Sequence, residues 1–138
     1  MSKQISGGCL CGAVHFKVDG DPVFAAFCHC KDCQKYTGTG HAAPMAFPES
    51  AVTITGATKS YTKTADSGNT ITRNFCPNCG SPVFNTLALM PGVVIVPAGA
   101  LDDPNEYEPA IAIYTSRAPK WDSTNDAVAK FPEGPPMG

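Results

Sequence analysis

The sequence lacks the features that mark membrane, nucleic-acid-binding and secreted proteins. It contains no run of ~18 apolar residues, so no membrane-spanning segment is expected. Lys and Arg number 10 and Asp and Glu 12, for a net charge of −2, which gives no reason to expect nucleic acid or an anionic membrane as a partner. Residues 1–8 contain no apolar segment of a secretory signal, so the reducing cytoplasm is the expected compartment.

Length and composition indicate a single, mostly β domain over residues 1–138, with residues 131–138 as a loose tail. Gly and Pro each number 13, which is typical of a turn-rich chain, and no long amphipathic helix is present. Residues 28–38 are expected to form a compact loop or a single helical turn, and 124–131 a short helix. Alternation and short apolar runs predict strands over residues 14–18, 23–27, 42–47, 52–55, 59–63, 70–75, 82–89, 93–96 and 110–115.

Cysteine is the residue type that carries chemistry in this chain. There are seven cysteines, an odd number that disulfides alone could not pair, and disulfides are rare in a reducing compartment. They fall into three tight groups, which are Cys9 and Cys11, then Cys28, Cys30 and Cys33, then Cys76 and Cys79. This grouping indicates metal binding.

Residues 76–80, CPNCG, have the chemistry of a zinc knuckle. Two thiolates separated by two residues can hold one ion from one side of a tight turn. Pro77 fixes the φ angle of the turn, and Gly80 tolerates the backbone angles that direct amides toward sulfur. Structural zinc usually has four ligands, so a second pair must come from elsewhere in the chain.

The seven cysteines can be divided in more than one way. The favoured division joins Cys9 and Cys11 to Cys76 and Cys79 in a closed four-cysteine site. Cys28, Cys30 and Cys33 then form a three-ligand site with an open fourth position, which is the arrangement of a catalytic zinc. Spacing also allows Cys30 and Cys33 to join the knuckle and leave three cysteines over. A single structural zinc with the remaining thiols as spectators is a further alternative.

The cysteine motifs resemble those of a known family. They are GCLCG at residues 8–12, CHCKDCQK at 28–35 and FCPNCG at 75–80, followed by IYTSRAP at 113–119 with Trp121 close behind. These segments are similar to the signatures of the glutathione-dependent formaldehyde-activating (GFA) family, whose relatives include centromere protein V. The resemblance extends over residues 6–133, nearly the whole chain.

The resemblance implies a fold, a pair of zinc ions and an activity. The fold is a β-tent of stacked antiparallel sheets. The structural zinc is expected on Cys9, Cys11, Cys76 and Cys79, and the catalytic zinc on Cys28, Cys30 and Cys33. The implied activity is a carbon–sulfur lyase reaction that forms or cleaves S-(hydroxymethyl)glutathione, the adduct of glutathione and formaldehyde. The second zinc is expected to be held loosely enough to be missing from an isolated sample.

The open position of the three-cysteine site is expected to take a thiolate or a carbonyl oxygen, so glutathione or another small thiol or aldehyde is the expected partner. His29, between two of the ligands, is expected either to be a proton shuttle that points outward or, as the favoured interpretation, to be exposed or beside the ligands without such a role. His41 is expected either to line the pocket or to be buried with one hydrogen bond. Three basic residues lie near the ligands in sequence: Lys31, Lys35 and Arg73. They are expected to form a solvated basic surface, and the alternative is that they bind the carboxylates of glutathione.

Two functions without catalysis remain as alternatives. A zinc-stapled β domain can serve as a binding module, which would show closed metal sites and a flat apolar surface patch. The three-cysteine group can also act as a thiol or zinc redox sensor, which would lose zinc reversibly under mild oxidation. The exposed strand edges of such a domain would allow a homodimer.

Overall fold

The computed structural model describes residues 4–65, 68–122 and 128–134, which are mostly β-strand. The chain divides into two compact units. The first contains Met1–Val23 and Met45–Tyr107, and the second contains Phe24–Pro44 and Glu108–Gly138. The prediction of a mostly β fold is confirmed.

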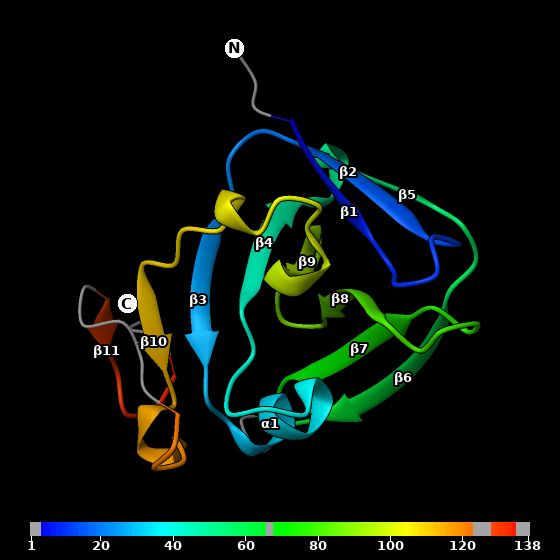
Figure 1. The fold of residues 1–138 in the computed structure, drawn as a ribbon. Helices are drawn as coiled ribbons and strands as arrows, with labels where there is room; N and C mark the ends of the chain where they lie inside the picture. The colour runs from blue at the N-terminus through cyan, green and yellow to red at the C-terminus, as the bar shows by residue number, and fades with distance from the viewer. Residues whose placement is uncertain (1–3, 66–67, 123–127, 135–138) are drawn as a thin grey trace. The chain divides into compact units, whose positions relative to one another are not determined.

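The first unit contains a three-stranded antiparallel sheet in the order β1-β2-β5 (Figure 1). These strands are Gln4–Gly8, His15–Asp19 and Val52–Thr55. In β2 the side chains of Phe16 and Val18 are buried while their neighbours are exposed, as expected for a strand with one face on a core.

The other strands of the first unit have the order β4-β9-β8-β7-β6. In that order they are Pro44–Pro48, Val93–Pro97, Pro82–Leu87, Thr70–Phe75 and Lys59–Thr64. The first residue of β4, Pro44, belongs to the second unit. Strands β6 to β9 pair antiparallel with their neighbours. The β7–β8 register shifts between Asn74 and Phe75, immediately before Cys76. The bulge therefore ends regular pairing where the chain enters the knuckle.

Three short 3-10 helices complete the first unit: η1 Glu49–Ala51, η2 Ala98–Ala100 and η3 Pro104–Glu106. Gly7 of β1 lies against the carbonyl of Ala100 and the ring of Phe16, where a Cβ would not fit. Close approach of the backbone at this point therefore requires glycine.

The second unit places β10 between β3 and β11, and both pairings are parallel (Figure 1). These strands are Ile111–Ile113, Phe24–Cys28 and Ala129–Lys130. Helix α1, Lys31–Thr37, follows β3, and the 3-10 helix η4, Thr115–Arg117, follows β10. Residues 28–30 connect the end of β3 directly to α1.

Some local expectations differ from the structure. Residues 129 and 130 form β11 where a short helix was predicted, because their backbone pairs with β10; residues 124–127 lie outside the described residues. The start of the predicted loose tail is anchored: the carbonyls of Phe131, Pro132 and Glu133 accept hydrogen bonds from the amides of residues 114–116. Residues 135–138 are not described. No helix in the described ranges is long and apolar enough to cross a membrane.

Candidate metal centre

Four cysteines of the first unit form one cluster. The sulfurs of Cys9, Cys11, Cys76 and Cys79 all lie within 4.8 Å of one another. Two Sγ–Sγ separations, Cys9–Cys11 and Cys11–Cys76, are 3.7 Å. Four thiolates ~2.3 Å from a tetrahedral zinc would be ~3.8 Å apart, so the donor set and its spacing fit this ion.

Two tight turns supply these four sulfurs. The first follows β1: the amide of Cys9 donates to the carbonyl of Val14 (3.0 Å), and Gly12 has φ +84°. The second follows β7: the amide of Cys76 donates to the carbonyl of Ser81 (3.0 Å), and Gly80 has φ +77°. A positive φ suits glycine, so the two glycines let each turn close around its sulfurs.

Polar groups outside the cluster donate to its sulfurs. These 3.2 Å contacts join Val14 N to Cys9 Sγ, Asn78 Nδ2 to Cys11 Sγ, and Ser81 Oγ to Cys79 Sγ. The hydroxyl and the backbone amide of Ser81 lower the pKa of the Cys79 thiol to about 5. Hydrogen bonds of this kind stabilise thiolate, which is the form that binds metal.

Three cysteines of the second unit form the other thiol cluster. The sulfurs of Cys28, Cys30 and Cys33 lie within 4.8 Å of one another. Cys28 ends β3, Cys30 is the N-cap residue of α1, and Cys33 lies in the first turn of that helix. Among the described residues no further Cys, His, Asp or Glu joins this group, so a metal bound here would keep a coordination position for another ligand.

The three sulfurs differ in acidity. Hydrogen bonds from the thiols of Cys28 and Cys33, together with the amide of Cys33, lower the pKa of Cys30. The pKa values of Cys28 and Cys33 are raised, chiefly because their thiols donate to neighbouring sulfurs. Cys30 is therefore the most acidic thiol of the three, and metal binding would release the protons that remain on the cluster.

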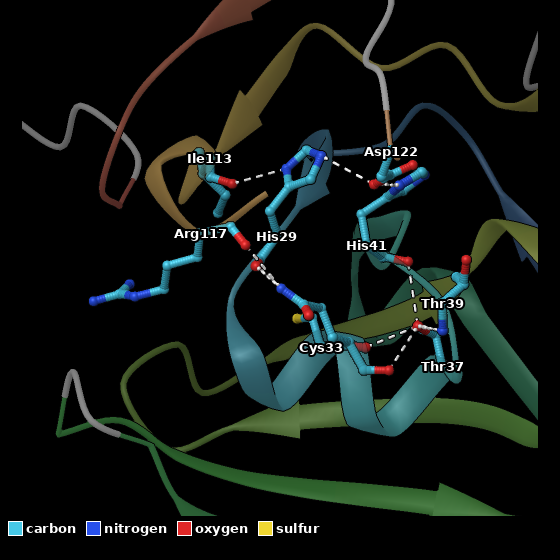
Figure 2. Close-up of polar contacts among 9 residues, drawn as sticks. His29, Cys33, Thr37, Thr39, His41, Ile113, Arg117 and Asp122 are labelled. Atoms are coloured by element: carbon cyan, nitrogen blue, oxygen red, sulfur yellow. Dashed lines mark hydrogen bonds and ion pairs between the residues drawn. The ribbon is translucent and has the colours of Figure 1, made fainter. Parts of the chain in front are cut away.

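Side chains of α1 fix the loop that carries this cluster (Figure 2). The Nε2 of Gln34 donates to the carbonyls of His29 (2.8 Å) and Arg117 (3.0 Å). The hydroxyl of Thr37 donates to the carbonyl of Cys33 (2.8 Å). The two Gln34 bonds tie the helix to the segment before it and to the chain after β10, and the Thr37 bond lies within the helix.

Tyr114 has an unusual backbone for a residue other than glycine, with φ +53° and ψ +37°. The guanidinium of Arg117 lies 5.1 Å from the centre of its ring. Burial, followed by the negative charge of Cys28 and Cys30, raises the pKa of the Tyr114 hydroxyl. A left-handed backbone at a residue other than glycine is the kind of strained position found at functional sites.

His29 does not point outward as expected of a proton shuttle. Its side chain is 0% exposed, and its Nδ1 lies 3.3 Å from the carbonyl oxygen of Ile113. Figure 2 shows its ring directed toward Asp122 and His41. His41 is half-buried and its Nδ1 lies 2.7 Å from Asp122 Oδ2, which agrees with the second expectation for that residue.

The three basic residues considered as carboxylate-binding candidates are divided between the two units. Lys31 and Lys35 are exposed on α1, the helix that carries Cys33. Arg73 is buried in β7 of the first unit. Asp122 was not predicted as a site residue. Its partner His41 is 81 positions away in the sequence, so no local motif indicates the contact.

The fold and the thiol clusters define a mostly β protein with cysteine-rich sites that can bind metal. Residues 4–117 match the sequence model of the glutathione-dependent formaldehyde-activating enzyme family, and the chain belongs to this family. A solved protein structure from Rhodobacter sphaeroides is similar in fold, with a TM-score of 0.57 and 22% sequence identity over 73% of this chain and 93% of that one. A comparison with curated proteins gives no match.

Proposed function

We propose that the chain is a zinc-dependent carbon–sulfur lyase of the GFA type, which cleaves S-(hydroxymethyl)glutathione to glutathione and formaldehyde and forms it in reverse. Membership of the family supports the reaction class. The observation that carries the proposal is the cluster of Cys28, Cys30 and Cys33, which supplies three sulfurs, one fewer than the four ligands of a tetrahedral zinc.

We assign the two thiol clusters different roles. Cys9, Cys11, Cys76 and Cys79 supply all four ligands of a tetrahedral ion, so we assign them a structural zinc. Cys28, Cys30 and Cys33 supply three, so we assign them the catalytic zinc. When bound there, zinc supplies a positive position for a substrate sulfur or carbonyl oxygen.

The charge of the three-cysteine cluster favours sulfur chemistry. Three thiolates carry more negative charge than a divalent ion offsets, which makes the site a poor generator of hydroxide and a suitable one for a soft sulfur ligand. In the lyase direction the C–S bond breaks and its electron pair remains on sulfur. The hydroxyl proton passes to solvent, which leaves glutathione thiolate and formaldehyde.

Residues around the cluster would bind the rest of the substrate. The raised pKa of Tyr114 keeps its hydroxyl protonated, so we assign it as a hydrogen-bond donor to the substrate oxygen. Lys31 and Lys35, exposed on α1, would bind the carboxylates of glutathione. A cytoplasmic location would keep the thiols reduced, and a homodimer through exposed strand edges stays a prediction.

The test compares lyase turnover in the wild type, Cys30→Ser and Lys17→Ala. Lys17 is exposed on β2 of the other unit and serves as the control. Consumption of S-(hydroxymethyl)glutathione is followed by NMR after subtraction of the spontaneous reaction. We expect Cys30→Ser to lose at least about 100-fold in turnover, since one metal ligand is gone, and Lys17→Ala to keep it. Equal turnover in all three proteins would exclude the catalytic role of the cluster.

A thiol sensor is the second candidate, favoured by the lowered pKa of Cys30, because a stabilised thiolate reacts readily with oxidants. The same samples distinguish it. A sensor would lose zinc reversibly under mild peroxide and show no turnover, whereas a lyase shows turnover in the reduced state.

A further inference from the structure

We propose that His29, His41 and Asp122 form a third metal site, which binds a divalent first-row transition-metal ion separately from the two cysteine clusters. All three residues belong to the second unit, and Figure 2 shows their side chains directed toward one another. Two imidazoles and one carboxylate are a ligand set that suits zinc, iron or cobalt rather than magnesium or calcium.

The spacing of the donor atoms fits one shared ion. The ligand atoms of the three residues lie within 4.8 Å of one another. His29 Nε2 is 3.6 Å from Asp122 Oδ2, and two ligands of a tetrahedral ion at ~2.0–2.1 Å would lie ~3.3 Å apart. His41 Nδ1 is 2.7 Å from the same oxygen, and ligands at right angles would lie ~2.9 Å apart. A small shift therefore brings all three onto one ion.

A buried ring nitrogen of His29 faces Asp122. Nδ1 lies 3.3 Å from the carbonyl oxygen of Ile113, which only accepts, so Nδ1 donates to it. Nε2 is fully buried, has no hydrogen-bond partner and lies 3.6 Å from a carboxylate oxygen of Asp122. A divalent ion between these two atoms would give both of them a partner. A ring N–H donated to a backbone carbonyl is also the usual arrangement of a metal-binding histidine.

The proposed site is distinct from the neighbouring cysteine cluster. His29 lies between Cys28 and Cys30 in sequence, but the contacts of its ring nitrogens are with Ile113 and Asp122. The two groups share no ligand atom, and the His29 ring packs beside that of His41 with their centres 5.3 Å apart.

A glycine makes room for the carboxylate. Gly40 is buried, and a Cβ added there would overlap the carboxylate of Asp122. Gly40→Ala would therefore displace Asp122 while leaving every proposed ligand in the sequence. This substitution therefore tests whether metal binding depends on the position of Asp122 and not only on the presence of the three ligand residues.

The experiment measures cobalt bound per chain in the reduced full-length protein after loading with excess Co²⁺ and gel filtration. The variants are Asp122→Asn and Gly40→Ala, and the control is His15→Ala, a histidine on the exposed face of β2. We expect the wild type and the control to hold one more cobalt per chain than the two variants. The sulfur-to-cobalt charge-transfer absorption should be equal in all four, because the cysteine clusters are unchanged.

Equal cobalt content in all four proteins would overturn the proposal. A loss of charge-transfer absorption in Asp122→Asn would also overturn it, because the aspartate would then act on the cysteines. Circular dichroism verifies folding; if either variant is unfolded, His41→Gln, at a partly exposed position, provides the same comparison. Lyase turnover does not enter the readout, so this result is independent of the proposed function.

Discussion

Ser81 and Asn78 both connect the two turns of the four-cysteine cluster, and Ser81 makes the larger number of contacts. Its hydroxyl accepts the amide N–H of Leu10 (3.0 Å) from the first turn and lies 3.2 Å from Cys79 Sγ of the second. Its carbonyl accepts from the amide of Cys76. One small polar side chain therefore both aligns the turns and stabilises a thiolate ligand.

Replacing Ser81 by alanine should make the cluster release zinc at a higher pH. The hydroxyl lowers the pKa of Cys79, so its removal raises that pKa and lets protons compete with zinc at less acidic pH. Affinity at neutral pH should fall by about 10-fold or more. Zinc release is followed against pH with a chromogenic chelator.

Ser60→Ala, on the exposed strand β6, is the matched control. Identical release curves for Ser81→Ala and Ser60→Ala would show that the hydroxyl plays no part in holding the metal.

Helix α1 is stabilised by capping residues and side-chain hydrogen bonds and not by packing in a hydrophobic core. It has seven residues and none of them is buried, which is too short for a helix that is stable alone. The sulfur of Cys30 caps its N-terminus, and Gly38, with φ +77°, caps its C-terminus in the left-handed conformation. Gln34 joins it to the carbonyls before and after it.

Gln34→Ala should weaken metal binding at Cys28, Cys30 and Cys33 by about 10-fold and leave the four-cysteine cluster unchanged. The substitution removes both side-chain bonds that fix α1 while keeping all three sulfurs. Competition with a chelator would show one zinc released earlier and the other at the wild-type concentration.

Lys35→Ala, at an exposed position of the same helix, controls for helix propensity. Unchanged release of both ions in Gln34→Ala would mean that the helix is positioned by other contacts.

Regular strands could be predicted from sequence, and short or glycine-rich elements could not. Val52–Thr55 and Thr70–Phe75 were predicted with their observed bounds, because β-rich segments bounded by turn residues carry a local signal. β1 was missed because Gly7 occupies a core-facing position without contributing an apolar side chain. β11 has two residues and exists only through pairing with β10.

At the scale of the whole molecule, the site depends on contacts between distant parts of the chain. Cys11 and Cys76 are 65 positions apart, and the spacing of cysteines favoured bringing them together without excluding other divisions. The structure groups the sulfurs by four and by three. Asp122 and the left-handed Tyr114 had no local signature, because their position results from tertiary packing.

We infer that the seven sulfurs form one closed and one open zinc site. Anomalous diffraction at the zinc absorption edge, from crystals of the zinc-loaded, reduced protein, would locate each ion and its ligands. We predict one peak surrounded by the sulfurs of Cys9, Cys11, Cys76 and Cys79, and a second bound by Cys28, Cys30, Cys33 and a non-protein ligand. The proposed site of His29, His41 and Asp122 would add a third peak without sulfur ligands. A single peak bound by sulfurs from all three sequence groups would contradict the account.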